Sequence, residues 1–139
     1  MFWFKKNNNE FKDIEVAICM ILIHAARIDN NYEENEKQLI KKCLIKLGIE
    51  DGNYISKLIS YCEIKETESV EILYMTKEIK KLEYYDRLKI LEMLFEVMYS
   101  DAELCCLEDR LIRKVAGLIY IENKDYGNLR RKFINDIYS

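Results

Sequence analysis

The most apolar run of the chain reads VAICMILI, from Val16 to Ile23. It spans about two helical turns between Glu15 and His24, whereas a membrane-spanning helix needs about 20 apolar residues. We therefore expect this run to form the middle of a buried helix over residues 11–28. Because apolar side chains cover nearly the whole circumference, other helices should surround it.

Apolar residues recur at helical spacing along the rest of the chain, and no strand pattern competes with them. Six further helices are predicted, over residues 33–47, 52–62, 66–82, 84–99, 106–119 and 124–138. Gly48 stands where the C-terminal cap of a helix is expected. The absence of proline and the presence of only four glycines favour long, uninterrupted helices. The sequence thus predicts an all-α fold, a compact bundle of about seven helices in one domain over residues 11–139.

The two halves of the chain resemble each other when residue n is aligned with residue n+72. The matched pairs fall on core positions and on two acids: Ile18 with Ile90, Leu22 with Leu94, Leu39 with Leu111, Ile40 with Ile112, Tyr54 with Tyr126, Asp29 with Asp101, and Glu36 with Glu108. We therefore expect two helix–corner–helix repeats, at about residues 11–62 and 84–138. A pseudo-twofold axis should relate them.

Each repeat carries two acids at its corner. The corners begin at Asp29 and Asp101, and a glutamate follows seven residues later, at Glu36 and Glu108. Helical side chains tilt toward the N-terminus of their helix, so each glutamate should point back at its own corner. Each corner is therefore expected to gather two carboxylates beside a helix N-terminus.

Two interpretations fit these acids. Carboxylates in the first turn stabilise a helix through its dipole, by about 0.3–1 kcal/mol each, and a corner aspartate can accept hydrogen bonds from the backbone. Alternatively, Asp29, Glu36, Asp101 and Glu108 form a site for Ca²⁺ or another divalent cation, since such ions prefer oxygen ligands. The site would not be an EF-hand, because position 12 after Asp29 is Ile40.

Composition excludes several classes of protein. The 139 residues carry a formal net charge of −3, whereas a nucleic-acid-binding domain should present a basic face. Five cysteines without a C-x-x-C pair and one histidine, His24, do not provide the usual zinc spacing. Buried thiols in a reducing, cytoplasmic environment are expected instead. Cys105 and Cys106 could form a redox or soft-metal pair at a helix start.

The corner sequences carry a family resemblance. The segments that carry it are Ala25-Ala26-Arg27-Ile28-Asp29 with Glu36, Tyr99-Ser100-Asp101-Ala102-Glu103-Leu104, Glu108 to Leu118, and Ile121-Glu122-Asn123-Lys124-Asp125-Tyr126. Over about residues 12–135 the chain resembles the tellurite-resistance TerB family, in particular its single-domain bacterial members of unassigned function. The family usually has glycine after each corner aspartate, where this chain has Asn30 and Ala102.

The resemblance implies an all-α fold of about seven helices with pseudo-twofold halves. It also implies a link to stress response and tellurite resistance, and metal binding at the acidic corners, which here are Asp29 with Glu36 and Asp101 with Glu108. A similar domain forms the N-terminal part of a DnaJ-like co-chaperone. Alanine adopts a left-handed backbone less readily than asparagine, so the first corner is the better metal candidate.

The sequence therefore predicts a non-enzymatic cytoplasmic protein that binds a divalent cation, a protein partner, or both. No glycine-rich phosphate loop, Ser/His/Asp set or metalloprotease motif is present. The alternative is a co-chaperone-like or membrane-complex adaptor without a ligand of its own. In that case Phe2, Trp3 and Phe4, in the aromatic and basic segment 1–10, could make a peripheral membrane contact.

Overall fold

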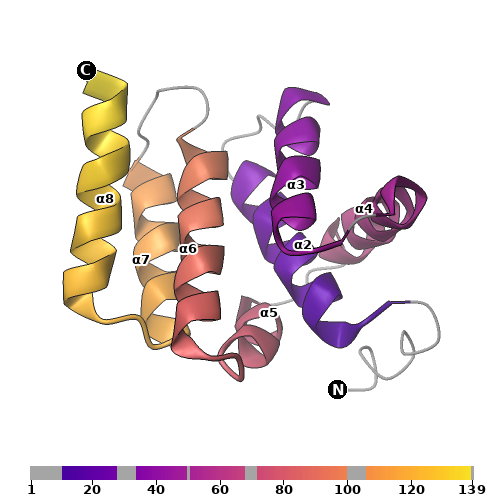
Figure 1. The fold of residues 1–139 in the computed structure, drawn as a ribbon, viewed down its shortest axis with the longest axis horizontal. Helices are drawn as coiled ribbons and strands as arrows, with labels where there is room; N and C mark the ends of the chain where they lie inside the picture. Colours follow the sequence, from indigo (N-terminus) through magenta and orange to yellow (C-terminus); the bar gives the residue numbers. More distant parts are fainter. Residues whose placement is uncertain (1–10, 28–33, 50, 68–71, 100–105, 139) are drawn as a thin grey trace.

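The computed structural model describes residues 11–27, 34–49, 51–67, 72–99 and 106–138. Within these ranges the chain is helical and contains no strand. The helices are α2 (Asp13–Arg27), α3 (Glu34–Lys46), α4 (Gly52–Thr67), α5 (Ile72–Ile79), α6 (Tyr84–Met98), α7 (Cys106–Leu118) and α8 (Asn123–Tyr138). The predicted all-α class is confirmed (Figure 1).

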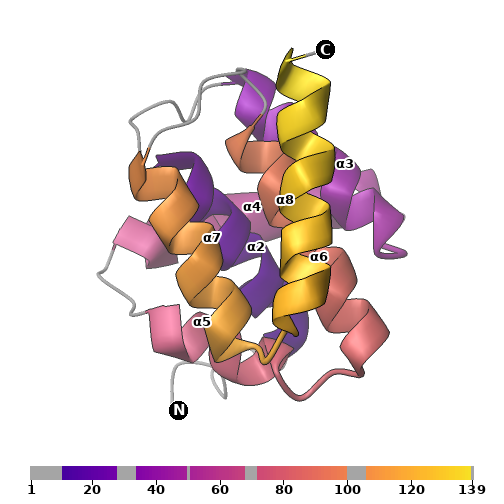
Figure 2. The same cartoon turned by 90° about the vertical axis from the view of Figure 1, so that its left-hand side faces the viewer.

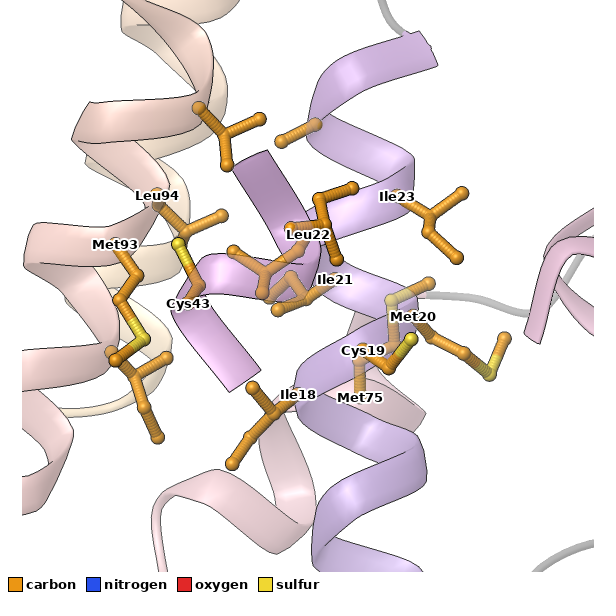
Figure 3. Close-up of a cluster of buried hydrophobic side chains, with 14 of the residues drawn as sticks. Ile18, Cys19, Met20, Ile21, Leu22, Ile23, Cys43, Met75, Met93 and Leu94 are labelled. Carbon is orange, nitrogen blue, oxygen red and sulfur yellow. The ribbon is translucent and has the colours of Figure 1, made fainter. Parts of the chain in front are cut away.

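Helix α2 is the centre of the fold, as its apolar sequence predicts. It packs against α3, α4, α5 and α6, and ten of its 15 residues are buried. Figure 3 shows side chains such as Ile18, Leu22 and Ile23 projecting from several sides of this helix. A helix with partners on so many sides must be apolar around its circumference, which is what residues 16–23 provide.

Helix α6 is a second centre. It packs against α2, α3, α7 and α8, and Figure 2 shows α8 lying along it. Phe95 is fully buried, and its ring centroid lies 5.5 Å from Tyr99, 5.9 Å from Tyr126 and 5.4 Å from Phe133. An aromatic cluster therefore joins α6 to α8.

The bounds of α3 and α7 follow the 72-residue register of the sequence, whereas α2 and α6, like α4 and α8, are offset by 71 residues. Helix α7 begins and ends 72 residues after α3, at 106 and 118 against 34 and 46. The turns that end these two helices also match. Gly48 and Tyr120 both have positive φ, 101° and 59°, and Ile49 N–H and Ile121 N–H close the same backbone bond, to Leu44 and Ala116 carbonyls. The pseudo-twofold axis itself, and the division into two repeat halves, stay predictions.

Two predicted helix boundaries were wrong. Helix α4 was expected to end at Cys62 but continues to Thr67, because no glycine or proline interrupts it. Residues 66 and 67 therefore belong to α4, and α5 covers only Ile72–Ile79 of the helix predicted over 66–82. At the other end of α4, the Asp51 carboxylate caps the helix by accepting a hydrogen bond from Asn53 N–H at 2.9 Å.

Among the described residues, no helix combines the length and the apolar character needed to cross a membrane. Phe2, Trp3 and Phe4, with the rest of segment 1–10, lie outside the described residues. Their predicted membrane contact stays a prediction.

Candidate functional site

Of the four predicted metal ligands, the structure describes the side chain of Glu36. This residue is half-buried in the first turn of α3. Glu108 is the third residue of α7, as Glu36 is of α3, but its side chain lies outside the described part. Asp29 and Asp101 also lie outside it. Whether the four carboxylates converge therefore stays a prediction. Among the described residues, no group of three or more His, Cys, Asp or Glu could hold a metal ion.

The helix N-termini that carry these acids face the same way. In Figure 1 and Figure 2, α3 and α7 both begin at the upper end of the molecule and run downward. The backbone N–H groups of a first turn and the helix dipole both favour negative charge there. Glu36 and Glu108 thus belong to two helix starts that open on one end of the bundle.

The described cysteines are core residues. Cys19, Cys43 and Cys62 are fully buried, and Figure 3 shows Cys43 of α3 beside Leu94 of α6. Burial raises the pKa of Cys19 well above its usual value. Burial, with Glu96 nearby, raises the pKa of Cys43 to about 12. Such thiols stay protonated and act as small apolar groups, as predicted for them. Cys105 and the Cys106 side chain lie outside the described residues.

A pocket of about 260 Å³ opens between α2, the C-terminal end of α3 and the start of α6. Its walls are mostly apolar, and they consist of Ile14, Ile18, Leu44, Leu47, Ile49, Leu82 and Ile90. The described part of the lining also includes the charged residues Lys12, Glu15 and Asp86. The pocket can accept a group that is apolar along most of its length and charged at one end.

Glu15 is the best-positioned charge of this pocket. It is half-buried, and its carboxylate accepts a hydrogen bond from the Tyr54 hydroxyl on α4. Burial and this carboxylate raise the pKa of Tyr54 to about 12. The phenol therefore stays a donor at neutral pH, and its hydrogen bond holds the Glu15 carboxylate in place.

In the second half of the chain, Arg87 stands 72 residues after Glu15. Its Nη1 donates to the carbonyls of Ile119 at 2.7 Å and Tyr120 at 3.2 Å. Its Nε donates to the Leu82 carbonyl at 3.1 Å, and its guanidinium lies 5.1 Å from the centre of the Tyr84 ring. One cation thus closes the C-terminal end of α7, where carbonyls carry partial negative charge.

Sequence analysis missed the pocket and its charged residues. The 72-residue register pairs Glu15 with Arg87 and Lys12 with Tyr84, and both pairs change the side-chain charge. Positions at which the two aligned segments agree do not include these residues. The charge reversal between Glu15 and Arg87 was the signal that pointed toward the site, although Lys37 and Asp109 reverse charge in the same register without lining it.

A family model described as tellurite resistance protein TerB matches residues 15–131. The matched region contains Glu15, Arg87 and both acidic corners. No curated protein and no solved structure was found to match the chain.

Proposed function

Because the chain belongs to the TerB family of tellurite resistance proteins, we propose that it is a non-enzymatic protein of the tellurite-resistance type. In this proposal it acts in the stress response by binding a divalent cation, a protein partner, or both. Its non-enzymatic character rests on the sequence, which contains none of the common catalytic motifs.

The observation that carries the metal proposal is the placement of Glu36 and Glu108. Each is the third residue of its helix, and α3 and α7 begin at the same end of the molecule (Figure 1). The predicted ligands Asp29 and Asp101 precede these helices by a few residues in the sequence. Carboxylate oxygens are ligands that Ca²⁺ and similar cations prefer.

The first corner is the stronger candidate. Asn30 follows Asp29, and asparagine accepts the left-handed backbone of a tight corner more readily than Ala102 does. The family resemblance also implies polar residues at the start of the second helix, where this chain has Cys105 and Cys106. We therefore assign the cation to Asp29 and Glu36, and regard Asp101 and Glu108 as the weaker pair.

Titration calorimetry with Ca²⁺, Mg²⁺, Mn²⁺ and Zn²⁺ tests this assignment. We expect one of these ions to release or absorb heat and to raise the melting temperature, because a ligand at 100 times its Kd adds about 2.7 kcal/mol to stability. The variant Glu36→Gln should bind about tenfold more weakly, since affinity follows the charge of the ligand set. The matched control is Glu34→Gln, in the same helical turn, which should bind like the parent.

Absence of heat and of a melting shift at ~5 mM of every ion, above the range of weak Ca²⁺ sites, would overturn the metal proposal. Equal affinities for Glu36→Gln and Glu34→Gln would do so too, because they would indicate a general effect of first-turn charge.

The alternative function is an adaptor in the cytoplasm with no metal of its own. The open pocket beside Glu15 favours it, because pockets with apolar walls and a few fixed charges are typical binding sites. Pull-down with and without residues 1–6 tests the predicted role of Phe2, Trp3 and Phe4. Loss of a membrane or protein partner on their removal would favour the adaptor.

A further inference from the structure

The C-terminal turns of α3 and α7 have the same backbone but different partners. In both turns the residue at positive φ, Gly48 or Tyr120, donates its N–H to the carbonyl three residues earlier. The carbonyls of Ile119 and Tyr120 also accept bonds from Arg87. No side chain of the described residues donates to the equivalent carbonyls of Leu47 and Gly48.

The side chain at the Arg87 position of the first half has the opposite charge. Glu15 lines the same pocket as Leu47 and Ile49 at the C-terminal end of α3, where the helix dipole is already negative. Asp86 adds a second carboxylate to the lining, and among the described residues Lys12 is the cation there. The local charge is complementary to an incoming cation, and Leu44, Leu47 and Ile49 offer apolar surface to its stem.

Arginine fits these features better than lysine. Its guanidinium carries five N–H donors in a planar fork, so one guanidinium can bond to several acceptors at once. Arg87 bonds to three carbonyls in this way, and an arginine in the pocket could bond to carbonyls and a carboxylate together. Its methylene stem covers apolar surface. A lysine ammonium is a compact point charge that cannot span these acceptors in the same way.

We propose that the pocket lined by Glu15, Leu47 and Ile49 binds an arginine side chain of a partner protein, in the place that Arg87 fills in the second half. This inference rests on the partner-binding part of the proposed function and names its contact site. The metal site at Asp29 and Glu36 is independent of it.

The test uses the full chain and the capped peptide acetyl-Leu-Arg-Leu-amide, with binding followed by amide chemical shifts in NMR titrations. The backbone amides of Leu47, Gly48 and Ile49 should shift. The same peptide with citrulline, a neutral analogue of arginine, should bind at least about tenfold more weakly, because its hydrogen bonds lose charge assistance. A lysine peptide should fall between the two.

Two variants of one position sharpen the test. Glu15→Gln should weaken arginine-peptide binding about tenfold, the effect of losing one charge-assisted bond. Glu15→Arg should abolish binding by filling the pocket from within. Glu122→Arg, the same charge change at an exposed position of the second half, is the matched control and should bind like the parent. Lys12→Ala should tighten binding severalfold, since it removes the competing cation.

Equal binding of the arginine and citrulline peptides would overturn the proposal, as would shifts that map away from the pocket. These two results need no variant, so they hold even if Glu15→Arg fails to fold. Peptide binding that appears only after removal of residues 1–6 would also overturn it, because the chain itself would then be the occupant. Metal titrations of Glu15→Arg should match the parent, so that failure of either site is distinguishable from failure of the other.

Discussion

The turns that end α3 and α7 share a backbone conformation, but different side chains surround them. In the second half, Arg87 closes the end of α7 and an aromatic cluster joins α6 to α8. In the first half, the position of Arg87 is taken by Glu15, the position of Phe95 is taken by Ile23, and a pocket opens at the end of α3. One copy of the turn is closed by its own side chain, and the other offers its carbonyl end to a ligand.

The strongest way to test the difference between the two cores is Phe95→Ala. Truncating a buried phenylalanine costs about 3–5 kcal/mol, and each lost ring pair adds to the loss of packing. Urea unfolding should show this decrease in the free energy of unfolding. Tyr85→Ala, at a side chain that is 72% exposed, is the control and should stay within about 0.5 kcal/mol of the parent. A loss below about 1 kcal/mol for Phe95→Ala would mean that the rings do not hold the second half together.

The next effect comes from the cation that closes α7. Arg87→Met keeps the apolar stem and removes the guanidinium, so we expect a loss of about 1.5–3 kcal/mol, the range for hydrogen bonds to a charged group. Glu15→Met in the first half should cost about 1 kcal/mol or less, because among the described residues the Tyr54 hydroxyl is the group that loses its acceptor. Thermal and urea unfolding measure both. Equal losses would contradict the view that the two turns are closed differently.

A smaller effect tests whether the turns share one backbone. Gly48 and Tyr120 both have positive φ, and an L side chain there costs about 1–2 kcal/mol. Apart from Gly48 itself and its two chain neighbours, no atom of the described residues lies within 4 Å of a Cβ built on Gly48, so Gly48→Ala should lose this amount through backbone strain.

Tyr120 supplies the matched measurement. Tyr120→Gly should be more stable than Tyr120→Ala by the same ~1–2 kcal/mol, since both variants remove the ring that faces Lys80. Different glycine-to-alanine differences at positions 48 and 120 would show that the two turns are not equivalent.

Much of the fold could be predicted because its signals are local. The apolar circumference of residues 16–23 predicted the central helix, and Gly48 predicted a C-terminal cap. The end of α4 was predicted too early because Glu63 to Thr67 show no strong apolar periodicity that would extend the helix. They also contain no glycine or proline that would mark its true end. Nothing local to Tyr120 predicted positive φ there, because tyrosine does not favour it. The alignment of Tyr120 with Gly48 in the 72-residue register is the sequence feature that indicates positive φ at Tyr120.

The candidate sites likewise include one that local sequence predicts and one that it does not. Glu36 could be placed at a helix start from spacing alone, and the structure has it there. The pocket could not be predicted, because it depends on how α2, α3 and α6 pack and on the Tyr54 hydroxyl, which comes from α4. Long-range contacts of this kind leave a trace in the sequence only as the charge reversal between Glu15 and Arg87.

The smallest predicted effect concerns alkaline pH and again separates the halves. The pKa of Tyr54 is raised to about 12 by burial and by Glu15, whereas an unfolded tyrosine titrates near 10. Above pH 10 the unfolded chain loses this proton first, so the stability contributed by neutral Tyr54 is full below pH 10 and is lost as pH rises toward 12. Urea midpoints measured between pH 9 and pH 12 should fall less steeply for Tyr54→Phe than for the parent.

Tyr84→Phe is the second-half counterpart, since burial and Asp125 raise the pKa of Tyr84 as well. Cys43 titrates in the same range in all three proteins and cancels in the comparison. Because burial is the larger cause of the raised pKa of Tyr54 and Glu15 the next, Glu15→Gln should flatten the profile in part, while leaving the contribution of Tyr84 in place. A parent-like slope in Glu15→Gln would mean that burial alone holds the Tyr54 proton, and that Glu15 keeps its carboxylate available to a cation entering the pocket.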